Sequence, residues 1–291
     1  MINPVISFLV TILLTPLWIK YAKRAGIIGT DLHKEEKKEV AEMGGIPILA
    51  GLFSGVFLSF DYELLPIALY LISVSFLGIT DDLLKFDKVE KIILPGIPAL
   101  ILGFKNPLLM PYLFITSSVV LNWTNMLAGL NGLESGLGIL LLASFSIISF
   151  LTKNTGAFLL SSCMMASLLA FLYYNRYPSR IFPGDCGTML IGAVFFSVVY
   201  LTKVVIPAFI VLIPYLMDSA LKFLSAGIMR REEKKPTKIK DGLLYSAGDY
   251  NSLIRVIISI RPMSEKKVVY CIWMIQTVFS LLGILSFLLL Y

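Results

Sequence analysis

The sequence is poor in charge and contains only one histidine and three cysteines. Charged residues make up 15% of the 291 residues and hydrophobic residues 57%, so the chain lacks the charge that a soluble domain of this length exposes. The single histidine, His33, excludes a metal site with several histidines and a relay between histidines. Cys163, Cys186 and Cys271 follow no disulfide or metal-binding spacing, so we expect each to be a small buried apolar side chain.

Long uncharged stretches occupy most of the chain. They are residues 4–19, 43–60, 64–80, 92–104, 106–133, 135–152, 154–175, 186–202, 204–217 and 268–291. Most approach the roughly 20 apolar residues that cross a bilayer as a helix. The stretch 92–104 is short and contains Pro95 and Pro98, 204–217 must continue past Asp218 to span, and 106–133 is expected to hold one span and a polar loop from Asn122. The pattern predicts a single domain, residues 1–291, that is an all-α polytopic membrane protein with about ten transmembrane helices.

Threading the chain through these ten spans places nearly all positive charge on one side of the membrane. Of the 25 Lys and Arg residues, only Lys105, Lys153 and Lys203 fall on the other side. By the positive-inside rule the charged side is the cytoplasm, and both termini face outward. No positive residue precedes the first span, so we expect an integral cell-membrane protein without a cleaved signal peptide. The net charge of +6 fits contact with anionic lipid headgroups and is weak support for nucleic-acid binding.

The first polar cluster is the pair Asp81 and Asp82 at the cytoplasmic end of the third span. Two carboxylates at a membrane boundary are costly unless they meet water, a cation or a metal. Neighbouring helical side chains diverge by about 100°, so one carboxylate could act as a base or metal ligand while the other orients a second group. A solvated helix end is the alternative. The nearby Lys85, Lys88 and Lys91 either bind a phosphorylated substrate or are ordinary positive flanks.

The second cluster runs from Asn122 to Glu134 and contains Asn125, Asn131 and two glycines. Asparagine carbonyls are hard oxygen donors suited to Mg²⁺, and asparagine amides can donate to phosphate or to a uracil ring. A helix cap followed by a turn is the alternative, because Asn and Gly favour both.

The third cluster, Gly184-Asp185, leads directly into the eighth span. An Asp at a helix start can cap the helix, or it can hold Mg²⁺ while backbone amides face a phosphate. Arg176 and Arg180 lie just upstream, and Thr188 either caps the helix or contacts a ligand.

Two further features lie near the C-terminus. Asp218 falls within the ninth span, where it is either functional or the partner of Lys222 one helical turn later. The last large loop, 227–267, contains a charge run at 230–240. It then contains an apolar piece, residues 249–261, that is too short to span and is expected to form a helix at the interface or against the bundle.

Taken together, these clusters resemble the polyprenyl-phosphate N-acetylhexosamine-1-phosphate transferase family (glycosyltransferase 4-like). The segment from Asn125 to Glu134 is most similar to the dolichyl-phosphate N-acetylglucosamine-1-phosphotransferase branch of archaea and eukaryotes. The bacterial peptidoglycan branch usually carries Asp at the positions of Ala128 and Asn131 and a histidine cluster in the last large loop, and neither is present here.

The resemblance implies a ten-helix fold, a homodimer, a cytoplasmic active site and a Mg²⁺ cofactor, with Mn²⁺ as an alternative. The implied reaction transfers GlcNAc-1-phosphate from UDP-GlcNAc to a dolichyl or polyprenyl phosphate and releases UMP. Asp81, Asp82 and Lys91 are the implied catalytic residues, with Lys91 contacting phosphate, and Asn125 and Asp185 would bind Mg²⁺ and the diphosphate. The remaining implied substrate contacts are Gly184, Asn131 near the uridine, Glu42 near the lipid or metal, and Lys238 and Lys240 in place of arginines found in relatives.

A polyprenyl phosphate is largely ionised near neutral pH, which favours its direct attack on the β-phosphate over a covalent aspartyl-phosphate route. The Asp81/Asp82 pair would orient the reactants or take a residual proton. Within the enzyme class, the alternative is another UDP-N-acetylhexosamine or an undecaprenyl-phosphate acceptor. A cation-coupled transporter that uses the acidic residues as ion ligands is the alternative from another class, followed by a membrane assembly scaffold.

Overall fold

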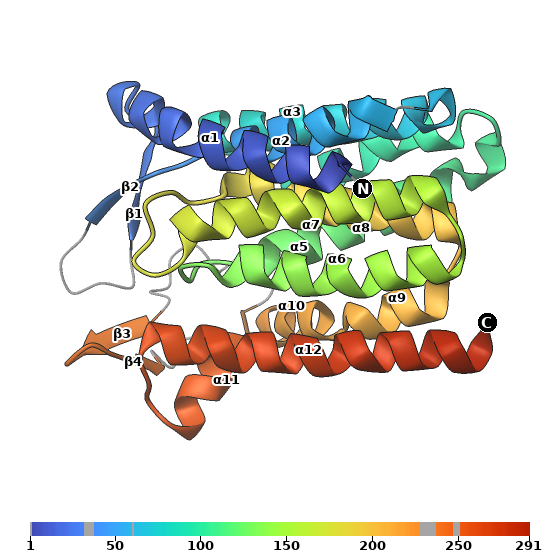
Figure 1. Ribbon diagram of the computed structural model, residues 1–291. Helices are drawn as coiled ribbons and strands as arrows, with labels where there is room; N and C mark the ends of the chain where they lie inside the picture. The colour runs from blue at the N-terminus through green and yellow to red at the C-terminus, as the bar shows by residue number, and fades with distance from the viewer. Residues whose placement is uncertain (1, 32–37, 60, 227–236, 247–250) are drawn as a thin grey trace.

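The computed structural model describes residues 2–31, 38–59, 61–226, 237–246 and 251–291, and in these ranges the chain is mostly helical. Six helices are long and apolar enough to cross a membrane, and Figure 1 shows that long helices run side by side along the bundle. They are α1 (Asn3–Arg24), α3 (Leu65–Leu84), α6 (Leu133–Leu151), α7 (Thr155–Asn175), α8 (Gly184–Thr202) and α12 (Glu265–Leu290). These helices confirm a largely helical membrane protein.

A bent pair of helices is the seventh candidate span. The helices α9 (Val205–Val211) and α10 (Ile213–Ala226) meet the length and composition of a span only together, and they bend by 57° between them. Pro207 and Pro214 lie within the first turns of the two pieces, where a proline is tolerated because the first amides of a helix lack partners. Helix α10 continues past Asp218 to Ala226, as this predicted span requires.

Three other predicted spans are shorter segments. Residues 43–60 form α2 (Gly45–Val56) and the 3₁₀ turn η1 (Phe57–Ser59), and residues 106–133 contain η4 (Pro107–Leu109) and α5 (Met110–Met126). Residues 92–104 contain the end of α4 (Lys88–Ile93) and the 3₁₀ helix η3 (Leu94–Gly103), as the prolines Pro95 and Pro98 remove α-helical hydrogen bonds. The turn η2 (Tyr62–Leu64) leads into α3.

Small residues bring α2 close to α1. A Cβ atom on Gly51 would lie 1.9 Å from the Oγ1 atom of Thr11, and one on Gly55 would lie 2.0 Å from the Oγ atom of Ser7. Close approach of backbones through small residues is the usual way in which helices associate inside a membrane. Because glycine allows this contact, the short helix α2 packs against α1.

Two small antiparallel hairpins were not expected from an all-α prediction. Strands β1 (Ile28–Asp31) and β2 (Lys38–Ala41) pair with Asp31 opposite Lys38, and β3 (Thr237–Lys240) and β4 (Leu243–Ser246) pair with Lys240 opposite Leu243. Both hairpins lie at the same end of the bundle, and α1 and α12 direct the two chain termini away from it (Figure 1). We call this end, with its strands and the ends of α3 and α5, the polar end.

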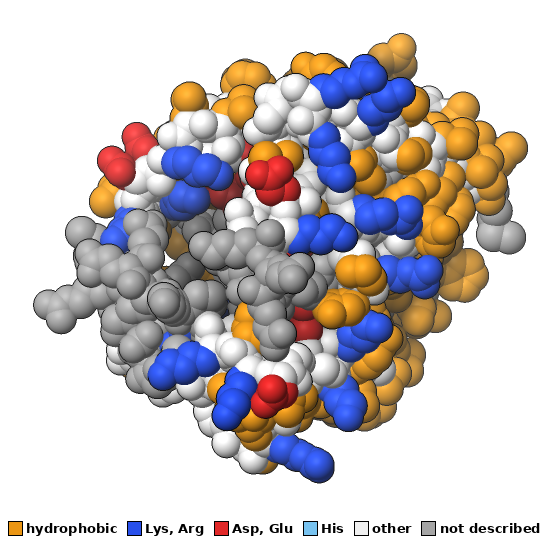
Figure 2. All heavy atoms as spheres, turned by 90° about the vertical axis from the view of Figure 1, so that its left-hand side faces the viewer, with side chains coloured by type: hydrophobic (Ala, Val, Ile, Leu, Met, Phe, Trp, Pro, Cys, Tyr) orange, Lys and Arg blue, Asp and Glu red, His pale blue; other side chains and the backbone are white. Residues whose placement is uncertain are grey.

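The expected short helix after residue 249 is α11 (Leu253–Ile260), whose N-terminus is capped by the side chain of Ser252 accepting from the amide of Arg255 at 3.2 Å. Leu253, Ile254 and Ile258 are buried, so the helix is tucked against the bundle at the polar end. Lys and Arg side chains surround this end, while apolar side chains cover one flank of the molecule (Figure 2).

Candidate active site

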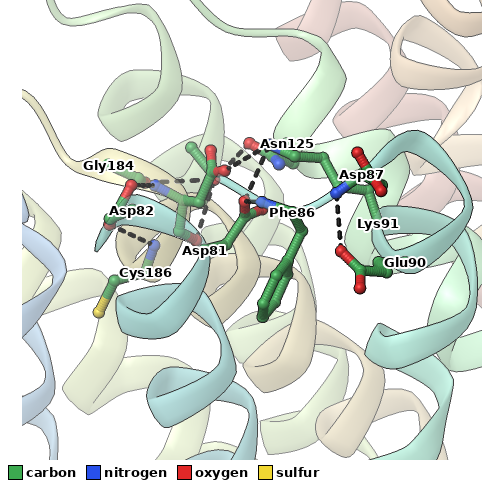
Figure 3. Close-up of polar contacts among 11 residues, drawn as sticks. Asp81, Asp82, Phe86, Asp87, Glu90, Lys91, Asn125, Gly184 and Cys186 are labelled. Atoms are coloured by element: carbon green, nitrogen blue, oxygen red, sulfur yellow. Dashed lines mark hydrogen bonds and ion pairs between the residues drawn. The ribbon is translucent and has the colours of Figure 1, made fainter. Parts of the chain in front are cut away.

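Helices α3 and α8 meet at the polar end with no side chain between them. A Cβ atom on Gly78 would lie 2.5 Å from the Cα atom of Cys186, so only glycine permits this approach. The contact places the last turn of α3, with Asp81 and Asp82, directly against the first turn of α8, with Asp185. Residues separated by about a hundred positions in the sequence therefore form one cluster, shown in Figure 3.

Asp82 caps helix α8. Its Oδ1 atom accepts from the backbone amide of Asp185 at 2.8 Å, and its Oδ2 atom accepts from the amide of Cys186 at 3.2 Å. These amides lack partners within the helix, and a carboxylate also complements the positive end of the helix dipole. Gly184 has a φ angle of +69°, and a Cβ atom there would lie 2.5 Å from Oδ2 of Asp82. Asp82 thus orients Asp185, and Gly184 provides the space for this contact.

Asp81 has a different environment on the same helix end. Its side chain is fully buried, and its Oδ1 atom accepts from the backbone amide of Phe86 at 3.0 Å and contacts Nζ of Lys91 at 3.0 Å. The Oδ2 atom of Asp81 is buried and has no hydrogen-bond donor in the part of the chain that the structure describes. A buried carboxylate oxygen without a donor costs stability, which is expected where a ligand or cation completes the site.

Lys91 contacts both the acidic end of α3 and the acidic start of α8. Its Nζ atom lies 3.0 Å from Oδ1 of Asp81 and 3.2 Å from Oδ2 of Asp185. The local sequence explains its position, because Asp87 and Glu90 form a reciprocal capping box that starts α4 and presents Lys91 in the last turn. Burial lowers the pKa of Lys91, but the carboxylates of Asp185 and Asp81 outweigh this effect and leave its pKa above the usual value. The ammonium group therefore remains charged at neutral pH.

Glu42 lies at the edge of the same cluster. Burial raises its pKa, the positive charge of Lys85 opposes this shift, and the negative charge of Asp185 adds to it. The side chain lies over Gly29, where a Cβ atom would be 2.0 Å from Oε1 of Glu42. The carboxylates of Glu42 and Asp185 are therefore close enough to interact electrostatically, which brings the loop before α2 near the cluster.

Asn125, in the last turn of α5, approaches the cluster from a third helix. Its Oδ1 atom accepts from the hydroxyl of Thr188 at 2.8 Å, and that hydroxyl lies 3.3 Å from the carbonyl of Gly184. The α5–α8 contact is close because a Cβ atom on Gly192 would lie 2.4 Å from Oγ1 of Thr124. The sequence left the role of Thr188 open. In the structure its hydroxyl donates to the side chain of Asn125 and helps to orient it.

Asn131 belongs to a separate buried network. Its backbone amide donates to Oε1 of Glu265 at 2.7 Å, its side-chain amide donates to Oδ2 of Asp31 at 3.0 Å and to Glu265, and its Oδ1 atom accepts from the amide of Ser179 at 2.7 Å. The network ties together β1, the loop after α5, the segment before α8 and the start of α12. Asp31, Ser179 and Glu265 had not been singled out, because only the fold brings them to Asn131.

The remaining predicted residues lie apart from these contacts. Lys238 and Lys240 are exposed on one face of β3, and the rest of the basic run before Thr237 lies outside the described residues, as does His33. Asp218 is fully buried, and its Oδ2 atom lies 2.6 Å from Nζ of Lys222. Its Oδ1 atom accepts from the amide of Leu253 at 2.9 Å, so Asp218 links α10 to α11.

The cluster offers oxygen donors for a divalent cation. Within the described ranges, no group of three His, Cys, Asp or Glu side chains is arranged as a metal site. Mg²⁺, however, is usually held by one or two carboxylates together with water and substrate phosphates. The carboxylate of Asp185, the unpartnered Oδ2 of Asp81 and the Oδ1 atom of Asn125 fit that donor set.

Comparison with known proteins identifies the family of the chain. The sequence profile described as glycosyl transferase family 4 matches residues 64–203, which include the cluster except for Glu42. A protein of Methanocaldococcus jannaschii, provisionally named a glycosyltransferase, is 41% identical over 265 residues, which cover 88% of this chain and 87% of the relative.

Two further relatives span nearly the whole chain. A protein of Sulfolobus acidocaldarius, provisionally named UDP-N-acetylglucosamine–dolichyl-phosphate N-acetylglucosaminephosphotransferase, is 29% identical over 98% of this chain and 95% of its own length. A phospho-N-acetylmuramoyl-pentapeptide-transferase of Clostridium novyi is 25% identical over 97% of this chain and 94% of its own length. The resemblance found in the sequence is confirmed, and this chain belongs to glycosyl transferase family 4.

Proposed function

We propose that this protein transfers GlcNAc-1-phosphate from UDP-GlcNAc to a dolichyl or polyprenyl phosphate, with release of UMP. The observation that carries the proposal is the cluster of Asp81, Lys91 and Asp185 at the polar end of a membrane bundle, where one buried carboxylate oxygen has no donor among the described residues. Such a cluster can hold phosphates beside a membrane, where a lipid phosphate and a water-soluble nucleotide must meet.

In this proposal the residues position two anions. An oxygen of the lipid phosphate forms a bond to the β-phosphorus of the nucleotide sugar, and the bond between that phosphorus and the oxygen bridging to UMP breaks. The lipid phosphate is largely ionised near neutral pH, so the attack needs no strong base. Lys91 supplies positive charge toward the reacting phosphates, and Asp82 with Gly184 holds Asp185 in place.

Mg²⁺ is part of the proposal. Asp81, Asp185 and Asn125 are the residues that would hold it, and the ion would neutralise charge on the phosphates. The proposal also places the polar end in the cytoplasm of a cell-membrane protein, supported by the positive charge gathered there.

The choice of substrate follows the family branch. The name of the Sulfolobus relative supports UDP-GlcNAc and dolichyl phosphate, and the presence of Ala128 and Asn131 agrees with that branch. The name of the Clostridium relative supports the second candidate, a bacterial-type N-acetylhexosamine donor with an undecaprenyl-phosphate acceptor. A panel of UDP-sugars and lipid phosphates distinguishes the two by which pair releases UMP.

The decisive experiment measures UMP release by purified protein in detergent, with Mg²⁺ varied. We expect Asp185→Asn to abolish turnover, since the variant loses a carboxylate that contacts Lys91 and is available to the cation. Asp61→Asn is the matched control, because Asp61 only caps the turn η2 at the opposite end of α3. Near-normal activity of Asp185→Asn would remove this residue from the metal site, and absence of UMP release by the unaltered protein for every pair tested would refute the proposed reaction.

A further inference from the structure

A polar cavity lies at the polar end, and the residues of the carboxylate cluster do not line it. It has a volume of about 620 Å³ and lies between the end of α7, the first turns of α12 and strand β2. Four cations line it, namely Lys38, Arg176, Arg180 and Lys266, and the lining contains no acidic residue. Asp81, Lys91, Asn125 and Asp185 do not contribute to it. Asn131, which the resemblance places near the uridine, is part of the lining, but its amides donate to Glu265 and Asp31 and its Oδ1 atom accepts from Ser179.

Aromatic rings hold three of the four cations in place. The guanidinium carbon of Arg176 lies 5.0 Å from the centre of the Tyr173 ring, that of Arg180 lies 4.8 Å from the Tyr174 ring, and Nζ of Lys266 lies 4.7 Å from the Tyr177 ring. The four cations are exposed, and none of them forms an ion pair with any residue in the described ranges. A concentrated positive charge therefore lines the groove, while the carboxylates of Asp31 and Glu265 are buried and accept from the lining residue Asn131.

The groove lies at the ends of two candidate spanning helices, at the level where a bilayer would meet water. Tyr173 belongs to the last turn of the spanning helix α7, Tyr270 and Trp273 belong to the first turns of α12, and the cations lie at or beyond the ends of these helices. Tyrosine and tryptophan prefer the headgroup level of a bilayer. Trp273 forms part of the floor, and it packs closely because a Cβ atom on Gly136 would lie 2.0 Å from its ring.

We propose that this groove binds the phosphate group of an anionic membrane phospholipid from the leaflet that faces the polar end. The four cations, which have no acidic partner in the described ranges, are opposite in sign to a headgroup phosphate, and the aromatic rings of the lining suit the glycerol and upper acyl region. Below the groove, Met274 and Val278 on α12 and Leu169 on α7 are exposed apolar side chains along which the acyl chains can lie. The lipid would thereby bridge the loop after α7, the start of α12 and strand β2.

The test compares lipid binding to delipidated protein by native mass spectrometry. Dioleoyl-phosphatidylglycerol and dioleoyl-phosphatidylcholine serve as probes, since they share acyl chains and differ in net charge. We expect the unaltered protein to retain phosphatidylglycerol in preference to phosphatidylcholine. The double variant Arg176→Gln/Lys266→Gln should bind phosphatidylglycerol more weakly by about five-fold for each cation removed. Both side chains make only ring contacts in the groove, so the thermal unfolding temperature of lipid-free variant should remain that of the lipid-free unaltered protein.

Lys105→Gln/Lys203→Gln is the control, because it removes the same charge from loops at the opposite end. Equal loss of phosphatidylglycerol binding in the control, or no loss in the groove variant, would overturn the proposal. The Michaelis constants for the nucleotide sugar and the lipid phosphate are measured on the same variants in neutral detergent. A ten-fold rise in either constant in the groove variant alone would also overturn it, since the groove would then be a substrate subsite.

Discussion

Asp81 and Asp82 are adjacent in the chain, yet their neutral variants should behave differently. Asp82 uses both oxygens to accept from amides of α8, so Asp82→Asn turns one amino group toward an amide that needs an acceptor. Loss of this cap should lower the stability of the fold by about 1–2 kcal/mol. Asp81→Asn keeps the Oδ1 acceptor for Phe86 and can place its amino group toward Asp185, so it should unfold at the same or a higher temperature while losing activity.

Thermal unfolding in detergent and UMP release on the same preparations measure the two effects. The expected pattern is an inactive but stable Asp81→Asn variant and a destabilised, weakly active Asp82→Asn variant. Equal unfolding temperatures for the two variants would show that the cap on α8 is not the main role of Asp82.

Gly184 gives a second prediction at the scale of one residue. Gly184 and Gly26 have similar φ angles, +69° and +73°, but only at Gly184 would a Cβ atom meet a neighbour, Oδ2 of Asp82 at 2.5 Å. Each alanine substitution carries the left-handed backbone penalty of about 1–2 kcal/mol. Gly184→Ala should in addition displace Asp82 and the start of α8, with a fall in kcat of about ten- to hundred-fold. If Gly26→Ala loses as much kcat as Gly184→Ala, backbone strain alone explains the effect.

The sequence predicted which residues belong to the cluster better than it predicted the contacts that each of them makes. The 100° divergence of neighbouring helical residues predicted different partners for Asp81 and Asp82, and in the structure Asp82 accepts from amides of α8 while Asp81 contacts Phe86 and Lys91. Which of them does so depends on the approach of α8 at Gly78, a contact that no local pattern contains. For the same reason the partners of Asn131 were not found, because Asp31 and Glu265 lie about 100 and 134 positions away along the chain.

At the scale of elements, the ion pair between Asp218 and Lys222 links the broken span to α11. Both side chains are buried, and Lys222 also donates to the carbonyl of Met126 at 2.5 Å. Asp218→Asn removes the carboxylate that lies 2.6 Å from the buried ammonium group and should destabilise the protein by about 3 kcal/mol. The double variant Asp218→Asn/Lys222→Met removes both charges, keeps an acceptor for the amide of Leu253, and should recover most of that loss.

Thermal unfolding of the two single variants and the double variant gives the coupling between the residues. The double variant should also retain UMP release, because the pair lies outside the carboxylate cluster. A folded double variant without activity would indicate instead that Asp218 takes part in function, as the transporter alternative requires.

Elements with a strong local signal were predicted well, and those that depend on a turn were missed. The prolines at 95 and 98 explain why the shortest predicted span is a 3₁₀ helix. The β3–β4 hairpin was missed although Asp241 and Gly242, with φ angles of +51° and +70°, form the Asp-Gly turn that joins such strands. The segment was interpreted only as a charged loop, and the Asp-Gly pair was the sequence signal that would have predicted the hairpin.

At the scale of the whole molecule, burial separates inner from outer helices. In the most apolar windows of α6 and α8, 72% of residues are buried, against 22% in α1 and 33% in α12. The outer helices therefore offer their apolar faces to lipid or, as the family resemblance led us to expect, to a second copy of the chain. The number of spans beyond the six long helices and the bent pair remains a prediction, as does the side of the membrane that each end faces.

Cysteine labelling of intact cells tests that prediction. Cys163 and Cys186 are fully buried, so replacing Cys271 alone with alanine provides an unreactive background. A cysteine introduced at Tyr62 or Leu108, both highly exposed at the end opposite the strands, should react with a membrane-impermeant maleimide from outside. A cysteine at Lys240 or Arg261, exposed at the polar end, should react only after the membrane is opened. Reaction of Lys240→Cys in intact cells would place the carboxylate cluster on the outer side, where the cell keeps no nucleotide sugar pool, and the proposed donor would then be untenable.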